Sequence, residues 1–304
     1  MSKLKTAVKL LKTPEKMVVP LASLGLFRWM PDEPYLKFVY RCQIGSKLNL
    51  DNPQTFTEKL QWLKLNDRKE LYHLFVDKYE VKQYVAEKIG SEYLIPTIGI
   101  WNAVDEIPFD ELPEQFVLKC THDSGSIVIC KDKSCFDFEK AKRKLAGHLK
   151  QSTYWFGREW PYKGLKPRII AEEYLEDSCT EELRDYKFFC FNGEVKCFKV
   201  DFDRFAFHRA HYYTPDGQLL ELAEVAYPPD YSRDIRLPTT IVKMKELAEK
   251  LVGSTPFLRV DFYDVNGRIY FGEMTFYPAS GLTKFIYENN DEMLGNWLTL
   301  PAKK

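Results

Sequence analysis

A chain of 304 residues can bury a large core and can hold one to three domains. Apolar residues make up 45% of the sequence and charged residues 29%, which excludes an intrinsically disordered protein. The chain carries 44 lysines plus arginines and 44 aspartates plus glutamates, so no net charge draws it to nucleic acid. Its seven cysteines are odd in number and form no CxxC pair, which argues against structural zinc and indicates reduced thiols in a cytosolic protein.

The N-terminus predicts a short basic amphipathic helix. Apolar residues from Leu4 to Leu11 recur at helical spacing, with lysines around them. Such a helix can dock on the protein's own surface or lie on an anionic membrane, and the sequence leaves both open. Residues 17–29 are apolar but too few to span a bilayer, and no convincing cleavage site follows. We therefore expect no signal peptide and a cytoplasmic protein, at the inner face of the membrane if this helix binds lipid.

Residues 1–66 are expected to be mainly helical and to end in a capped helix. Thr55 or Thr57 can be the capping residue, and Thr55 with Glu58 has the spacing of a capping box. Strands and helices then alternate. In chain order the pattern predicts a helix at 77–89, strands at 93–101, 116–120 and 127–133, a helix at 136–150, strands at 167–175, 185–191, 196–202, 207–213 and 218–222, a helix at 237–251, a hairpin at 259–281 and a helix at 282–298.

The most informative stretch is residues 259–281, RVDFYDVNGRIYFGEMTFYPASG, which predicts a β-hairpin. It carries two acids, Asp261 and Glu273, with Thr275 two residues further on. Two carboxylates on adjacent strands, followed by a Pro/Gly loop, can hold Mg²⁺ against the phosphates of a nucleotide. Taken alone, the same pattern also fits an ordinary half-exposed β-ribbon.

Whether the two acids share a face depends on the turn between the strands. If residues 265–267 form a three-residue loop, Asp261 faces Phe271, and Glu273 then lies on the face of Asp261. A two-residue Asn-Gly turn would put Glu273 on the opposite face. A metal site therefore requires the longer loop, and we predict it.

Residues 116–126, FVLKCTHDSGS, predict a strand that carries Lys119 and leads into a loop with Ser124, Gly125 and Ser126. Backbone N–H groups of such a loop can cradle phosphate oxygens while the lysine neutralises their charge. The spacings of a Walker A loop and of a Rossmann fingerprint are absent. A lysine before a Ser-Gly turn is also common in purely structural hairpins.

Two further segments offer contacts for a nucleotide. Residues 169–176, IIAEEYLE, form an apolar strand whose exit can present backbone groups to an adenine edge, or an edge strand with solvated acids. Asp185 and Lys187 share one face of the next strand, where they can reach ribose hydroxyls and phosphates. Arg204 and Arg209 can hold a carboxylate or a transferring phosphoryl group, or can simply be solvated.

Other catalytic arrangements receive no support. The histidines lack the spacing of metal ligands, and no Ser/His/Asp or Cys/His dyad is visible. The acids after the apolar strand are expected to lie at the surface rather than to form a glycosidase pair: Glu172, Glu173, Glu176 and Asp177.

In this order the pieces resemble the ATP-grasp superfamily, and more specifically the TupA-like (teichuronopeptide biosynthesis) proteins of bacterial polysaccharide clusters. The resemblance is carried by NPQTFTEKLQWLKLNDR, DKYEVKQYVAEKIGSEYLIP, FVLKCTHDSGS and FGEMTFYPASGL, in the right order over residues 30–300. It implies an α+β ATP-grasp fold with a helical extension (1–66), an N-terminal α/β subdomain (67–115), a lid (116–172) and a C-terminal subdomain with the metal site (173–304).

By this resemblance ATP lies between the lid and the C-terminal sheet. The implied contacts are Lys119, Lys187, Ser124, Gly125 and Ser126 for the phosphates, Glu172, Glu173, Tyr174 and Leu175 for the adenine, Asp185 for the ribose, and Asp261, Glu273 and Thr275 for Mg²⁺. Many ATP-grasp enzymes have Glu-x-Asn where this chain has Glu-Met-Thr, which leaves a second metal position open.

The resemblance implies carboxylate–amine ligation, in which ATP phosphorylates a carboxylate and an amine then displaces the phosphate. Lys187 would offset charge on the γ-phosphoryl group, and Arg204 or Arg209 would stabilise the acyl phosphate. The expected substrates are an amine or amino acid and a uronic-acid-type carboxylate of a bacterial surface polysaccharide. Two alternatives are a glycosyltransferase, with Asp201-Phe202-Asp203 as its DxD motif, and a non-catalytic nucleotide-binding protein.

Overall fold

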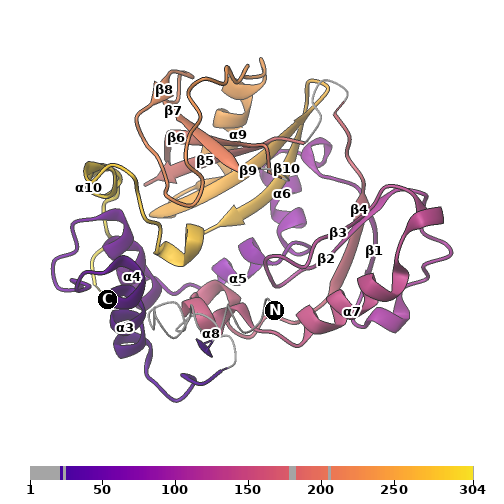
Figure 1. Ribbon diagram of the computed structural model, residues 1–304, viewed down its shortest axis with the longest axis horizontal. Coiled ribbons are helices and arrows are strands. Elements are labelled where there is room, and N and C mark those ends of the chain that lie inside the picture. Colours follow the sequence, from indigo (N-terminus) through magenta and orange to yellow (C-terminus); the bar gives the residue numbers. More distant parts are fainter. Residues whose placement is uncertain (1–20, 23–24, 178–182, 205–206, 304) are drawn as a thin grey trace, which may run out of the picture.

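The computed structural model describes residues 21–22, 25–177, 183–204 and 207–303. The predicted basic N-terminal helix and Cys179 lie outside these residues. Within the described part, the chain forms two antiparallel β-sheets with helices between and around them (Figure 1). None of the helices in these ranges is long and apolar enough to cross a membrane.

The smaller sheet has four strands in the order β1-β4-β2-β3. Their bounds are β1 Thr97–Trp101, β2 Phe116–Cys120, β3 Val128–Cys130 and β4 Ile169–Glu173. Phe116 and Leu118 of β2 are fully buried in a small core of their own, against Leu145 of α7 (Phe138–Leu149). Because side chains alternate along a strand, Lys119 lies on the other face of this sheet.

The larger sheet has six strands in the order β10-β9-β5-β6-β7-β8. Their bounds are β5 Asp185–Phe191, β6 Glu194–Phe202, β7 Arg209–Tyr213, β8 Leu219–Leu220, β9 Phe257–Val265 and β10 Arg268–Thr275. Helix α9 (Ile241–Val252) packs on β5, β6 and β9 through Met244 and Leu251. Lys187 and Phe188 point to opposite faces of β5, so the sheet carries an apolar face and a face with charged residues.

The remaining helices join the larger sheet in one hydrophobic core. They are α3 Asp32–Ile44, α4 Phe56–Asn66, α5 Leu71–Val76, α6 Val81–Ile89, α8 Thr153–Gly157 and α10 Asn289–Trp297. Phe56 of α4 packs on Phe257 of β9, with ring centroids 4.9 Å apart. The predicted capping box starts α4: the Thr55 hydroxyl accepts the N–H of Glu58 at 3.3 Å. Figure 1 shows α5 and α6 between the two sheets.

Three predicted helices start a turn or more later than expected, those at 77–89, 237–251 and 282–298, and the first and the last have a local cause. The helix predicted at 77–89 starts later because the Asp77 carboxylate accepts the N–H groups of Tyr79 and Glu80 and forms a turn. The closing helix predicted at 282–298 starts later because Phe285 is held in a β-bridge to another segment. The predicted division into subdomains stays a prediction, although β1 pairs with β4 across the boundary expected at residue 115.

Candidate functional site

The hairpin β9–β10 brings the predicted acids together, but not by the predicted loop. The turn has two residues, Asn266 and Gly267, with φ angles of 53° and 81°. A β-bulge at Gly272 then adds one residue to β10, and Glu273 pairs with Asp261. The prediction of a three-residue loop is therefore wrong. The two-residue turn alone would put Glu273 on the face opposite Asp261, and the bulge returns it to the same face.

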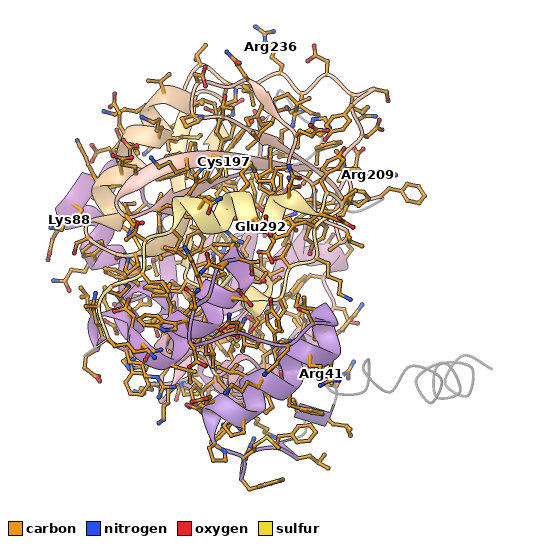
Figure 2. All side chains as sticks on the ribbon, turned by 90° about the vertical axis from the view of Figure 1, so that its left-hand side faces the viewer. Arg41, Lys88, Cys197, Arg209, Arg236 and Glu292 are labelled. Carbon is orange, nitrogen blue, oxygen red and sulfur yellow. The ribbon has the colours of Figure 1, made fainter. Side chains whose placement is uncertain are left out.

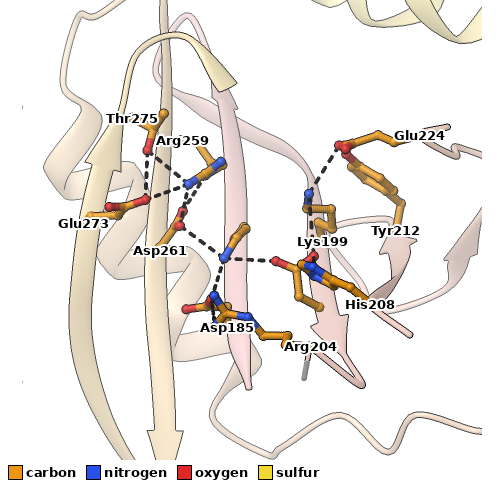
Figure 3. Close-up of polar contacts among 12 residues, drawn as sticks. Asp185, Lys199, Arg204, His208, Tyr212, Glu224, Arg259, Asp261, Glu273 and Thr275 are labelled. Atoms are coloured by element: carbon orange, nitrogen blue, oxygen red, sulfur yellow. Dashed lines mark hydrogen bonds and ion pairs between the residues drawn. The ribbon is translucent and has the colours of Figure 1, made fainter. Parts of the chain in front are cut away.

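Arg259 holds these groups together on the larger sheet (Figure 3). Its Nε lies 2.7 Å from Asp261 Oδ1, and its Nη2 lies 2.9 Å from Glu273 Oε1. The same Nη2 lies 3.1 Å from the Thr275 hydroxyl. No role for Arg259 was predicted from the sequence, although its place two residues before Asp261 puts both side chains on one face of β9.

Lys187 stands at the centre of the sheet, directly opposite Asp261 on the neighbouring strand. Its Nζ lies 2.7 Å from Asp185 Oδ2, 3.1 Å from Asp201 Oδ2 and 3.5 Å from Asp261 Oδ2. Arg204 Nη1 lies 2.5 Å from Asp185 Oδ2. The structure thus brings most of the predicted residues of this sheet into one group. We name it the acidic cluster: Asp185, Lys187, Asp201, Arg204, Arg259, Asp261, Glu273 and Thr275.

Pairing with cations keeps most of the acidic cluster ionised. Burial raises the pKa values of Asp185 and Asp201. Neighbouring cations lower these pKa values by more than burial raises them, so both lie below their ordinary values. Burial lowers the pKa of Lys187, yet its carboxylate neighbours hold it above the ordinary value. Asp261 differs, because burial raises its pKa more than Arg259 lowers it. A bound cation would lower the pKa of Asp261 again.

The smaller sheet and α6 carry a second, basic group. Lys119 on β2 and Lys82 on α6 flank the Glu172 carboxylate, with N–O distances of 2.5 and 2.6 Å. Glu172 lies on β4, between β1 and β2 in the sheet, and it pairs with Val117 of β2. Its side chain is buried, so the prediction of a surface acid is wrong for this residue. Burial raises the pKa of Glu172, but the two lysines outweigh it and leave the pKa below its ordinary value.

Lys78 extends this group toward the acidic cluster. Its ammonium contacts the carbonyl oxygen of Asp123, and its side chain lines a small recess together with Tyr162 and Glu273. Burial lowers the pKa of Lys78; Glu273 opposes that effect and Lys119 adds to it. We name Lys78, Lys82, Lys119 and Glu172 the basic cluster. These four side chains carry three positive charges and one negative charge, and the excess of positive charge attracts phosphate groups.

The small-residue loop after β2 is held mainly by its own side chains. The Ser126 hydroxyl accepts the N–H of Cys120 at 2.7 Å and donates to Asp123 at 2.6 Å. Ser124 and Gly125 are exposed at the tip, where Gly125 has a φ of 94°. Ser126 therefore serves the internal structure of the loop, while the backbone of the other two faces solvent. Their contact with phosphates stays a prediction.

The residues predicted to surround the adenine differ in their exposure and contacts in the structure. Glu172 belongs to the basic cluster, as described above. Glu173 is exposed, and its backbone N–H donates to the carbonyl of Pro96 at 3.1 Å. Tyr174 and Leu175 are partly buried at the exit of β4. Adenine binding at this exit stays a prediction.

Arg209 lies on the face of β7 opposite the acidic cluster. Its neighbour Ala210 pairs with Asp201, so Arg209 points to the opposite face of β7, where its charge acts on Asp230. Figure 2 labels Arg209 near the edge of the molecule in that view. The structure thus brings Arg204 into the acidic cluster and places Arg209 on the other face of β7, and the catalytic role of either arginine stays a prediction.

The side chains of the hairpin fit Mg²⁺. Asp261 and Glu273 offer facing carboxylates and Thr275 offers a hydroxyl, and Mg²⁺ prefers such hard oxygen donors. The side chain of Glu273 is 44% exposed, so a cation can reach it. In the described ranges no three residues among histidine, cysteine, aspartate and glutamate gather as a metal site. Water and phosphate oxygens would therefore complete the coordination of the ion.

The structure thus combines two antiparallel sheets with a basic cluster next to one and an acidic cluster on the other, a distribution of charge that suits phosphate groups and a cation. The family model of the TupA-like ATP-grasp proteins matches residues 58–299. The chain therefore belongs to the TupA-like ATP-grasp family. This membership confirms the predicted family and the predicted ATP-grasp fold. No curated protein matches the chain.

Several solved structures are remotely similar. A D-alanine–D-alanine ligase from Bacillus anthracis is 17% identical with a TM-score of 0.38, and the match covers 66% of this chain and 57% of that one. The D-alanine–D-alanine ligase from Helicobacter pylori is 15% identical with a TM-score of 0.43, covering 80% and 69%. The ATP-grasp ligase PsnB, solved with a precursor variant, Mg and ADP, is 10% identical with a TM-score of 0.41, covering 84% and 65%. This chain thus spans little more than half of the B. anthracis enzyme.

Proposed function

We propose that this protein is an ATP- and Mg²⁺-dependent ligase that joins an amine to a carboxylate through an acyl phosphate. The proposal is carried by one observation: the basic and acidic clusters meet at a recess that Lys78 and Glu273 line together. A triphosphate with its Mg²⁺ matches this distribution of charge. The phosphates suit the lysines, and the cation suits the carboxylates of the hairpin.

The basic cluster would bind the phosphates of ATP. Glu172 fixes the ammonium groups of Lys82 and Lys119 within 2.6 Å of its oxygens, so both point into the same region before ATP arrives. Lysines held in this way lose little conformational entropy when a phosphate binds. Lys78 would contact the phosphate nearest to the acidic cluster.

The acidic cluster would act on the phosphoryl group in transfer. Mg²⁺ held by Asp261 and Glu273 would neutralise charge on that group. Arg259 and Lys187 are already buried and oriented by carboxylates, so they present fixed positive charge where negative charge develops. Arg204 is 38% exposed beside Asp185, a position from which it can meet the carboxylate of a substrate.

The reaction needs no side-chain nucleophile. An oxygen of the substrate carboxylate attacks the γ-phosphorus of ATP, and ADP leaves. The amine nitrogen then attacks the carbonyl carbon of the acyl phosphate, and phosphate leaves as the amide forms. The protein contributes binding, orientation and fixed charge. The smaller sheet would exclude water, which otherwise hydrolyses the acyl phosphate.

The proposed substrates are an amino acid or other amine and a uronic-acid-type carboxylate of a bacterial surface polysaccharide. Support comes from the resemblance to TupA-like proteins of polysaccharide clusters and from the cations Lys187 and Arg204, which suit a carboxylate. We place the reaction in the cytoplasm. The basic residues 3–16 are the segment that would touch an anionic membrane.

A glycosyltransferase finds no support in the DxD motif. Asp201 is buried beside Lys187, whereas Asp203 has a φ of 53° and lies 3.3 Å from Arg233. The two carboxylates therefore serve different cations and do not form a joint metal site.

Trapping with hydroxylamine tests the proposal. The protein is incubated with ATP, Mg²⁺ and a panel of uronic acids, and both hydroxamate and ADP are measured. We expect hydroxamate only when ATP, Mg²⁺ and a carboxylate are all present. Transfer from a nucleotide sugar without cleavage of ATP would refute the proposal. A screen of amino acids against the reactive carboxylate, read by phosphate release, then identifies the amine.

A further inference from the structure

Asp201 connects the acidic cluster to a second polar group on β6 and β7. Its Oδ2 lies 3.1 Å from Lys187 Nζ. Its Oδ1 lies 3.3 Å from His208 Nε2 and 3.6 Å from Lys199 Nζ. Figure 3 shows His208 beside Lys199, away from Asp261 and Glu273 of the hairpin. The two oxygens of one buried carboxylate thus contact a residue of the proposed phosphoryl site and an imidazole.

The imidazole of His208 lies between an aromatic ring and a carboxylate. Its ring lies against the ring of Tyr227, with centroids 4.1 Å apart, and its Nε2 faces Asp201. The side chain is 26% exposed while Nε2 is buried, so a ligand can reach another part of the ring. A carboxylate at one ring nitrogen and an accessible second nitrogen are what a general base requires.

The other four histidines of the sequence are used differently. Each has a ring nitrogen bonded to a group outside the acidic cluster: His73 to the Pro161 carbonyl, His122 to the Gln151 carbonyl, His148 to Asp123, and His211 to the Asp230 carbonyl. His208 is thus the histidine that contacts the acidic cluster.

We propose that His208 is the general base that accepts the proton of the attacking amine, an inference that rests on the proposed function. The amine binds as an ammonium, and one of its protons goes to Nδ1 of His208 and from there to water. The lone pair that this frees forms the C–N bond, and the C–O bond to phosphate breaks. Phosphate leaves with the electron pair of that bond and takes the second proton of the nitrogen. Asp201 holds the ring and stabilises the imidazolium.

The position of His208 suits this step. Lys187 contacts the same carboxylate from the other side, and the γ-phosphoryl group would lie at Lys187 in the first half of the reaction. The acyl phosphate therefore forms within reach of both residues. Lys199, which contacts Asp201 and lies 3.3 Å from Glu224, would hold the carboxylate in place.

A comparison of two nucleophiles, an alkyl amine and hydroxylamine, shows whether His208 acts as a base or has only a structural role. An alkyl amine must lose a proton to become reactive, whereas hydroxylamine is already neutral at pH 7. The full-length His208→Gln variant is assayed for amide and for hydroxamate with the same carboxylate. We expect amide formation to fall about 10²-fold or more. Hydroxamate formation should stay within about twofold of wild type, because acyl phosphate formation does not need the base.

A matched control is His211→Asn: His211 lies on β7, which begins directly after His208, and it points to the face opposite that of Asp201. Whatever this variant does to stability, the ratio of amide to hydroxamate should stay that of wild type. The inference is overturned if His208→Gln lowers both products equally or leaves both unchanged. A wild-type protein that forms neither product would instead refute the proposed function itself.

Discussion

The two halves of the site hold their charges in different ways. The acidic cluster lies on neighbouring strands of one sheet, so the register of the strands fixes every distance in it. The basic cluster is assembled from α6, the residues before it and the smaller sheet, which has its own core. A group on one sheet suits the chemical step, and a group that connects the core of the smaller sheet to α6 in the larger core suits the capture of ATP. Substitutions in the acidic cluster should therefore change turnover, and those in the basic cluster should change affinity.

Glu273→Gln should have the largest effect. The change keeps the shape of the side chain but removes one charged Mg²⁺ ligand, so we expect ATP turnover to fall about 10³-fold. The side chain is 44% exposed, and the fold should survive. ATP cleavage, circular dichroism and thermal unfolding check this. Normal turnover in a folded variant would remove Glu273 from the metal site.

Arg259→Met should show how much the acidic cluster depends on this arginine for stability. The variant leaves Asp261 buried without its main partner, which we expect to lower the free energy of unfolding by about 3–5 kcal/mol. Urea unfolding measures the loss. Arg259→Lys, which restores a charge, should recover part of it. A variant as stable as wild type would mean that this pair is not buried as described.

Lys119→Met, in the basic cluster, should change the affinity for ATP more than the rate of turnover. We expect the Kd for ATP to rise about 10- to 100-fold, the effect of losing one charge-assisted contact, while the rate at saturating ATP changes less. Calorimetry and steady-state kinetics separate the two quantities. An unchanged Kd with a low rate would reverse the division of labour between the clusters.

Arg204→Ala and Arg209→Ala form a pair that tests the register of β7. Arg204 contacts Asp185 of the acidic cluster, and Arg209 points to the other face. We expect a loss of about tenfold or more in kcat/KM for the first variant and at most about twofold for the second. Equal losses would contradict the placement of Arg209.

The smallest expected effect is on stability in acid. The pKa values of Glu172 and Asp185 lie below their ordinary values of 4.5 and 3.8, because lysines and an arginine outweigh burial. Their contribution to stability is therefore complete above about pH 5 and is lost as the pH falls below the ordinary values, since the unfolded chain then binds protons first. Urea unfolding from pH 7 to 3 should show this fall. Glu172→Gln should make it shallower, and an identical profile would contradict the shift.

Local patterns predicted the parts of the site that depend on local rules. The capping box at Thr55, the strand that carries Lys119 and the hairpin with Asp261 and Glu273 all follow from spacing and alternation. The predicted three-residue turn is wrong because the bulge at Gly272, and not the turn, aligns Glu273 with Asp261. A glycine inside a strand is a recognised signal for such a bulge. A single extra residue decides the face of every side chain beyond it.

The rest of the site depends on contacts between distant segments. Lys82 fits the pattern of an amphipathic helix, and nothing near it in the sequence shows that it pairs with Glu172. The same pairing buries an acid that was expected at the surface. Likewise, the contact between His208 and Asp201 requires the register of two strands that no local motif specifies.

The most direct test of the two-cluster account is the Kd of ATP, measured by calorimetry with and without Mg²⁺, for wild type, Glu273→Gln and Lys119→Met. The account predicts that Mg²⁺ tightens binding to wild type and to Lys119→Met but not to Glu273→Gln. It also predicts that Lys119→Met binds more weakly than wild type in both conditions. If Glu273→Gln keeps the full effect of Mg²⁺ on ATP binding, the hairpin does not hold the metal and the account is contradicted.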